Sequence, residues 1–199
     1  YISLDPDKKN IDENDGLLCR SFNEINKRSG LAFIRTVDQY FSPFMMGPDD
    51  VFMSGPVFAS KDKDVLIFTL ENYRNSPDLY LMTDIIREQV DEARRTCKLG
   101  NITRQLSSLN PQQKDYNWGT AEIYKWKAFT GKMEEGVLYK PENFDPTKKY
   151  PMILYFYETH SNTLHSYIPP TPTGSRLNIS FFVSRGYVVF SPDIRYTVG

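Results

Sequence analysis

One short segment of the chain gathers residue types that could bind a metal ion. Glu158, His160 and His165 lie in the sequence ETHSNTLHSYIPPTPTGS and give the pattern Glu-x-His-x4-His. Carboxylate and imidazole groups are ordinary zinc ligands, but this spacing matches no zinc-hydrolase motif. Both histidines also lie in a proline-rich loop. We therefore expect a solvated or substrate-rim loop, with no metal and no cofactor.

The sequence lacks the motif that would carry a serine nucleophile. An α/β-hydrolase places that serine in a G-x-S-x-G turn between a strand and a helix. No such pattern occurs in the 199 residues, so neither His160 nor His165 is interpreted as a triad base. The adjacent Glu134 and Glu135 lie in a predicted hairpin, where we expect a solvated charge pair.

Composition excludes two classes of partner. The formal net charge is -1, with 40% hydrophobic and 25% charged residues. No global basic field indicates nucleic-acid binding. No apolar run reaches the 18 or so residues that a membrane span needs. The two cysteines, Cys19 and Cys97, could pair or remain free, and the sequence leaves both states open.

The first hundred residues have the pattern of short strands separated by polar turns. Strands are predicted at 17–22, 31–37 and 79–83, and a hairpin at 56–71 turns at KDKD. The intervening PFMMGPDDVFMSGP contains two Gly-Pro pairs and is predicted to be a loop. Strands this short and this closely spaced are typical of all-β architecture. A propeller blade and a sandwich fit the pattern equally well.

The segment 84–101 interrupts this pattern. Its apolar residues recur at about every fourth position, and Gly100 could end a helix. The segment is interpreted as a short amphipathic helix or as a long charged insertion between strands.

The second half contains elements that would position the Glu-His loop. A hairpin is predicted at 121–140, followed by an apolar strand at 150–158, a helix at 176–186 and a second apolar strand at 187–194. Near-continuous apolar strands are typical of parallel sheets buried on both faces. A strand, a helix and a strand in this order predict a βαβ unit. The Glu-His loop would then follow the carboxyl end of the first strand.

These segments also carry a resemblance to a known family. The stretch WGTAEIYKWKAFTGKMEEGVLYKPENFDPTKKYPMILYFYE resembles the junction of the prolyl oligopeptidase family of serine peptidases, in its dipeptidyl-peptidase-IV-like branch. Lys148 to Pro151 match its "KKYP" strand, and Asp193 with Arg195 match its D-x-R motif. The resemblance covers about 110–199, is weaker over 50–83 and is negligible before residue 45.

The resemblance implies a fold and a domain division. The fold class would be mixed, with all-β propeller-blade strands followed by the first strands and helix of an α/β-hydrolase sheet. Residues 1–120 would be the C-terminal part of the propeller, with 1–45 undefined. Residues 121–199 would be the N-terminal part of the hydrolase domain, ending before the nucleophile.

The resemblance also implies one catalytic residue. Alignment of YPMILYFYETH places Tyr157 at the position of a tyrosine whose hydroxyl stabilises the oxyanion. Loss of such a donor costs on the order of 10² to 10³ in rate. The residues after Tyr157 depart from the small residues usual in that branch. The alternative is that Tyr157 is an ordinary core or rim aromatic residue.

The function implied is that of a fragment of a serine exopeptidase or oligopeptidase. Its longer parent would act on a peptide substrate by acyl-enzyme chemistry, and the fragment alone would be inactive because it lacks the triad. A homodimer of the parent and an exported or periplasmic location would follow from the family only. Two alternatives stay open, namely a stand-alone binding module and a fragment of an esterase with the same fold.

Overall fold

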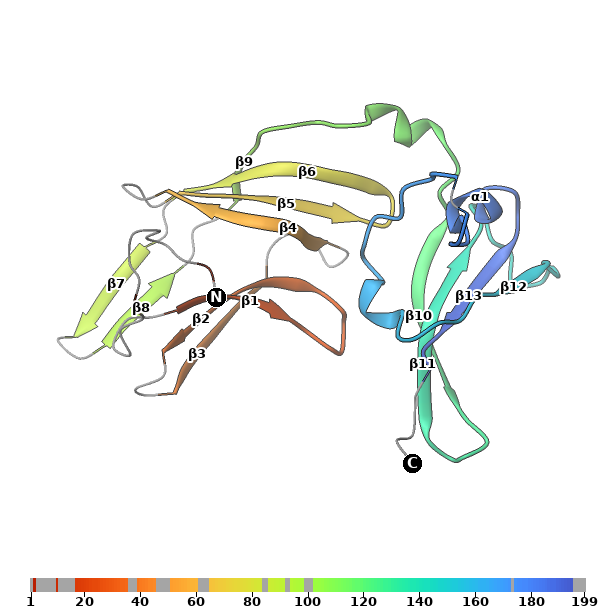
Figure 1. Ribbon diagram of the computed structural model, residues 1–199, viewed down its shortest axis with the longest axis horizontal. Coiled ribbons are helices and arrows are strands. Elements are labelled where there is room, and N and C mark those ends of the chain that lie inside the picture. Colours follow the sequence, from red (N-terminus) through yellow and green to blue (C-terminus); the bar gives the residue numbers. More distant parts are fainter. Residues whose placement is uncertain are drawn as a thin grey trace. The chain divides into compact units, whose positions relative to one another are not determined.

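The computed structural model describes residues 2, 10, 17–35, 39–45, 51–60, 65–83, 86–91, 94–98, 102–172 and 174–194. Side chains are described for these residues except 40, 42–45, 86–91, 94–98, 102 and 103. The chain divides into two compact units (Figure 1). Unit 1 comprises Tyr1–Glu71 and Pro77–Leu109, and unit 2 comprises Asn72–Ser76 and Asn110–Gly199.

Three sheets contain the strands of unit 1. The first has the order β1-β2-β3, from Leu17–Phe22, Ser29–Arg35 and Tyr40–Met45. The second has the order β4-β5-β6-β9, from Phe52–Ala59, Leu66–Asn72, Asn75–Met82 and Ile102–Gln105. The third pairs β7 and β8, Ile86–Asp91 and Arg94–Lys98.

The core of unit 1 follows from strand alternation. In β5, Leu66, Phe68 and Leu70 point to one face and are buried, because side chains of a strand alternate between its two faces. Leu31 of β2 and Met82 of β6 are fully buried in the same cluster. Burial of large aliphatic and aromatic groups stabilises such a unit by about 1.5 to 3 kcal/mol for each side chain.

Unit 2 is built on one mixed sheet with the order β10-β11-β13-β12. Its strands are Thr120–Lys127, Met133–Lys140, Val188–Pro192 and Met152–Leu154, respectively. Strand β11 is antiparallel to both β10 and β13, whereas β12 and β13 are parallel. The turn in TGK, with Gly131 at φ 82°, reverses the chain between β10 and β11.

A short helix covers one face of this sheet. The helix α1, Ile179–Val183, is capped by Asn178, whose side-chain oxygen accepts a hydrogen bond from the Phe181 N–H at 3.1 Å. An N-cap of this kind satisfies an amide that the helix itself leaves unpaired. Ile179 and Val183 pack on Val137, Tyr139 and Val189 of the sheet in one buried cluster.

The tip of the β5–β6 hairpin, Asn72–Ser76, completes the core of unit 2. The Tyr73 ring packs against those of Tyr139 and Trp118, with centroids 5.3 and 6.5 Å apart. Burial raises the pKa of the Tyr139 hydroxyl above its ordinary value, and a hydrogen bond with Thr163 opposes that shift. Arg74 pairs with Glu142 at 3.2 Å, a bond near the surface that contributes little by itself.

The predicted fold class is wrong. The described residues form four mostly antiparallel sheets of two to four strands and a single α-helix of five residues. They contain no layer of hydrolase helices, and their small sheets do not establish a propeller. The predicted strand 150–158 is reduced to β12, which lies at the edge of the sheet with Met152 and Leu154 more than half exposed. The apolar run therefore reflects an uncovered edge, not a strand buried on both faces.

Individual elements were predicted with unequal success. The hairpin 121–140 is confirmed, with Ile123 opposite Val137, and so is the parallel pairing of the two apolar segments. The helix at 84–101 is wrong where the structure describes it, because β7 and β8 pair there. Part of the loop at 43–56 is strand. The helix at 176–186 is shorter than predicted and begins after Asn178, not after Ser175.

The domain division at residue 120 stays a prediction, because compactness does not show that either unit folds alone.

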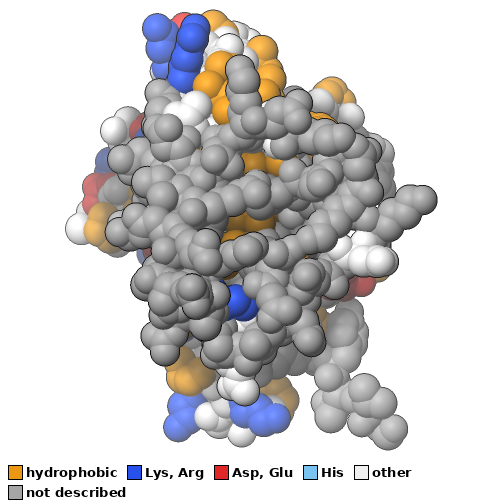
Figure 2. All heavy atoms as spheres, turned by 90° about the vertical axis from the view of Figure 1, so that its left-hand side faces the viewer, with side chains coloured by type: hydrophobic (Ala, Val, Ile, Leu, Met, Phe, Trp, Pro, Cys, Tyr) orange, Lys and Arg blue, Asp and Glu red, His pale blue; other side chains and the backbone are white. Residues whose placement is uncertain are grey.

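Figure 2 shows one face of the molecule, on which hydrophobic, cationic and anionic groups are interspersed among the described side chains. Among the described residues, no helix combines the length and hydrophobicity required to span a bilayer.

Candidate functional site

The loop after β12 contains the residues that the sequence singled out. Tyr155 continues the parallel pairing, with its N–H donating to the Phe190 carbonyl at 3.0 Å. The chain then leaves the sheet, and Phe156 and Tyr157 are 59% and 66% exposed. Since neither ring is buried, the loop presents them to solvent and not to the core of unit 2.

The backbone of this loop is held by the end of β13. Glu158 adopts a left-handed conformation with φ 53°, and its carbonyl accepts the Ile194 N–H at 2.7 Å. A left-handed conformation is uncommon for residues other than glycine and requires support from its surroundings. The hydrogen bond to Ile194 is one such support. It fixes the direction of the chain directly after Tyr157.

Asp193 is the main anchor of the loop. One carboxylate oxygen accepts the N–H groups of His160 at 2.7 Å and Ser161 at 2.8 Å. These amides open the 3-10 turn η2, Ser161–Thr163, so the negative charge lies where unpaired amides need an acceptor. Ser161 is 1% exposed. The Asp193 carboxylate thus holds the loop on the sheet through backbone contacts.

The structure does not assemble the Glu-His segment into a metal site. The His160 ring packs on Tyr155 with centroids 5.5 Å apart, and its Nε2 atom is buried without a hydrogen-bond partner among the described residues. Within the described part of the chain, no group of three His, Cys, Asp or Glu side chains could hold a metal ion.

The remaining sequence candidates have structural surroundings of their own. Glu135 pairs with Lys125 at 3.4 Å, and its carbonyl accepts the Asp193 N–H at 3.0 Å. Its carboxylate is therefore partly engaged across the β10–β11 pair, and not only solvated. Cys19 has a free thiol, while the side chain of Cys97 and all of Arg195 lie outside the described residues.

The chemistry that this loop offers is a hydrogen-bond donor, the Tyr157 hydroxyl, and a surface for binding a ligand. Tyr157 offers an exposed phenol hydroxyl. Such a hydroxyl can donate to an oxygen on which negative charge develops. The role of Tyr157 as an oxyanion donor stays a prediction. Sequence reasoning missed the anchoring role of Asp193, although the residue was noted at the end of an apolar strand and in the D-x-R match.

This chain resembles known proteins in fold and not in sequence. No family model matches the chain, and no curated protein sequence matches it. The fold is similar to that of AtxE2 isopeptidase in a variant with astexin3-dC4 bound, at a TM-score of 0.59 and 12% identity over 92% of this chain. It is also similar to the apo form, at a TM-score of 0.57 and 12% identity over 90% of this chain.

The chain spans about a quarter of the length of these similar proteins, covering 24% of each. The predicted membership of the prolyl oligopeptidase family is wrong: no family model supports it, and the similar structures are those of an isopeptidase. At this identity the likeness concerns the fold alone.

Proposed function

We propose that these residues form part of a hydrolase that cleaves amide bonds of peptides through an acyl-enzyme, with its nucleophile outside residues 1–199. The observation that carries the proposal is the similarity of fold to an isopeptidase over 92% of the chain. One of those isopeptidase structures has astexin3-dC4 bound, which makes a peptide the first substrate class to consider.

In this proposal the Tyr157 hydroxyl donates a hydrogen bond to the oxyanion of the tetrahedral intermediate. Its exposure after β12 and the fixed backbone of Glu158 support that role, since an oxyanion donor must be both accessible and preorganised. Asp193 is then a positioning residue, because it acts on the loop and not on the substrate. The 199 residues alone bind peptide but do not hydrolyse it, since they lack a nucleophile elbow.

The test compares the native polypeptide with the 199-residue chain. An antibody raised against the β10–β11 hairpin captures from the source cell every polypeptide that contains these residues. Mass spectrometry measures the molecular mass of each captured polypeptide. The polypeptides are then treated with a fluorophosphonate probe and assayed on peptide-amide and ester substrates.

We expect a polypeptide longer than 199 residues that reacts with the probe and cleaves the amide, while the 199-residue chain does neither. A native polypeptide of this length without probe labelling would instead support a stand-alone binding module. Cleavage of the ester with no cleavage of the amide would support an esterase. Either result contradicts the proposal.

A further inference from the structure

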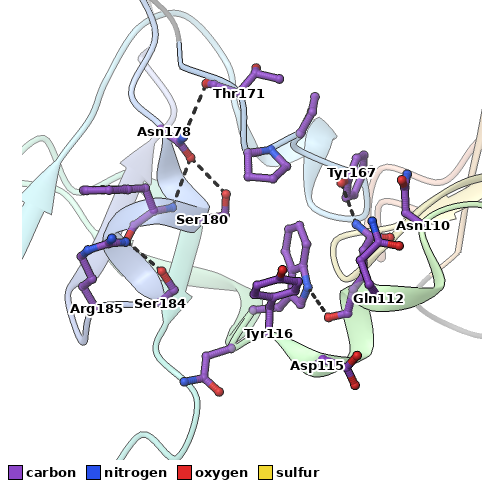
Figure 3. Close-up of a pocket in the computed structure, with 16 residues that line it drawn as sticks. Asn110, Gln112, Asp115, Tyr116, Tyr167, Thr171, Asn178, Ser180, Ser184 and Arg185 are labelled. Atoms are coloured by element: carbon purple, nitrogen blue, oxygen red, sulfur yellow. Dashed lines mark hydrogen bonds between the residues drawn. The ribbon is translucent and has the colours of Figure 1, made fainter.

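A pocket in unit 2 has a lining that does not include Tyr157. Its volume is about 780 Å³, and its lining comes from η1 (Pro111–Asp115), the proline-rich loop and α1 (Figure 3). Volumes of about 300 to 1,000 Å³ are typical of sites for small ligands. The pocket was not predicted from the sequence, because its nearest facing residues, Trp118 and Tyr167, are 49 positions apart in the chain.

One wall of the pocket is held rigidly by Gln113. This side chain is buried, accepts the Ser76 N–H at 3.0 Å and donates to the Tyr167 hydroxyl at 2.6 Å. The Gln113 carbonyl also accepts the Trp118 indole N–H at 2.9 Å. Since both ends of the amide are engaged, Gln113 fixes η1 against the loop that contains Tyr167.

Aromatic groups form much of the lining. The rings of Trp118 and Tyr167 pack with centroids 5.6 Å apart, and Tyr116 is 66% exposed beside them. Phe181 lines the pocket from α1 and is also exposed. Tyrosine and tryptophan combine apolar area with a polar tip and are well suited to hold the backbone and small side chains of a peptide.

Two opposite charges flank these rings. Asp115 stands on the η1 side of the pocket and Arg185 on the α1 side (Figure 3). The Arg185 guanidinium stacks on the Phe181 ring at 3.7 Å and donates to the Phe181 carbonyl at 3.3 Å. A guanidinium has five N–H donors, so this contact leaves donors for a carboxylate.

The charge pattern narrows the class of ligand. A nucleotide or another polyanion would need several cations, and Arg185 is the one cationic side chain among the lining residues. The remaining polar lining consists of amides and hydroxyls, including Gln112, Asn117 and Ser184. One carboxylate and one guanidinium on opposite sides fit a ligand with an ammonium at one end and a carboxylate at the other.

We propose that this pocket binds short peptides with free ends, with the ammonium near Asp115 and the carboxylate near Arg185. The choice of peptides among zwitterions rests on the proposed function, because cleavage of a peptide releases such fragments. The site would then retain or sense a hydrolysis product.

The experiment titrates the tripeptide Ala-Ala-Ala into the full 199-residue chain and follows the indole N–H signals by NMR. Trp118 lines the pocket, whereas Trp126 lies on β10 and serves as the internal control. We expect the Trp118 signal to move and the Trp126 signal to stay. N-acetylation or C-amidation of the tripeptide should each weaken binding about tenfold, since each removes a charge-assisted hydrogen bond.

Variants assign each end of the ligand. Asp115→Asn should bind the free and the N-acetylated peptide equally, and Arg185→Gln should bind the free and the C-amidated peptide equally. Lys149→Gln, an exposed change outside the pocket lining, is the matched control and should retain the full dependence on both ends. A folded variant should still depend on the other end of the tripeptide, whereas an unfolded chain would lose the dependence on both ends.

Two outcomes would overturn the proposal. One is the absence of a Trp118 shift at millimolar tripeptide, or a shift that is insensitive to blocking of the ends. The other is equal affinity for 6-aminohexanoate, a zwitterion without peptide groups, which would exclude peptides as the preferred class. Neither outcome bears on the probe-labelling test of hydrolysis, so failure of the two proposals can be distinguished.

Discussion

At the scale of single residues, Asp193 is the side chain on which the candidate loop depends most. Its carboxylate accepts two backbone N–H groups, and the amide of Ser161 among them belongs to a residue that is 1% exposed. Removal of the acceptor leaves the partly buried amides without a partner. The resulting loss of folding free energy is larger than the net contribution of the two hydrogen bonds.

We therefore predict that Asp193→Ala destabilises unit 2 by about 2 to 3 kcal/mol and that Asp193→Asn, which keeps an acceptor oxygen, costs about half as much. Hydrogen exchange of the His160 and Ser161 amides and unfolding in urea measure the two effects. Asp115→Ala, an exposed aspartate, is the matched control and should change stability by less than about 0.5 kcal/mol. Equal stability of Asp193→Ala and this control would show that the anchor is unimportant.

At the scale of elements, the close approach of β11 and β13 sets a strict requirement for glycine. A Cβ atom on Gly136 would lie 2.5 Å from the Ser191 carbonyl oxygen and 2.6 Å from the Pro192 Cα. Both atoms belong to the backbone, so neither can move aside without separating the strands.

Gly136→Ala is accordingly expected to destabilise unit 2 by about 3 kcal/mol or more. Gly174→Ala is its matched control, because nothing lies within 4 Å of the added carbon, and it should be close to neutral. Thermal unfolding of the two variants beside the parent chain makes the comparison. If both variants melt together with the parent, the described packing of β11 on β13 is wrong.

Elements with local signals were predictable from the sequence. The hairpin 121–140 carries alternation on both strands and a glycine turn, and the structure confirms it. Segment 84–101 misled because its apolar residues also recur at helical spacing, yet β7 and β8 pair there. The apolar run 150–158 indicated burial on both faces, but burial depends on neighbouring strands that a single segment does not specify.

At the scale of the whole molecule, the sequence predicted Tyr157 as a site residue, but it did not predict the anchoring role of Asp193 or the pocket. Tyr157 was found through a resemblance that the comparisons do not support, and its role stays a prediction. Asp193 and the pocket between η1 and α1 depend on contacts between segments distant in sequence. Periodicity reports which residues share a face of one element, but it does not report which elements meet.

If the proposed function holds, the 199 residues alone are expected not to hydrolyse peptides. Peptide hydrolysis needs a nucleophile, a base and an oxyanion site, and the proposal assigns only the last of these to residues 1–199.

The most direct measurement of the central claim is the rate of amide hydrolysis by the native polypeptide carrying Tyr157→Phe. We predict that kcat falls by about 10² to 10³, with KM little changed, because the lost hydroxyl acts on the transition state. Phe156→Leu, a change at the adjacent exposed ring, is the control and should retain most of the activity. An unchanged kcat in the Tyr157→Phe polypeptide would contradict the account.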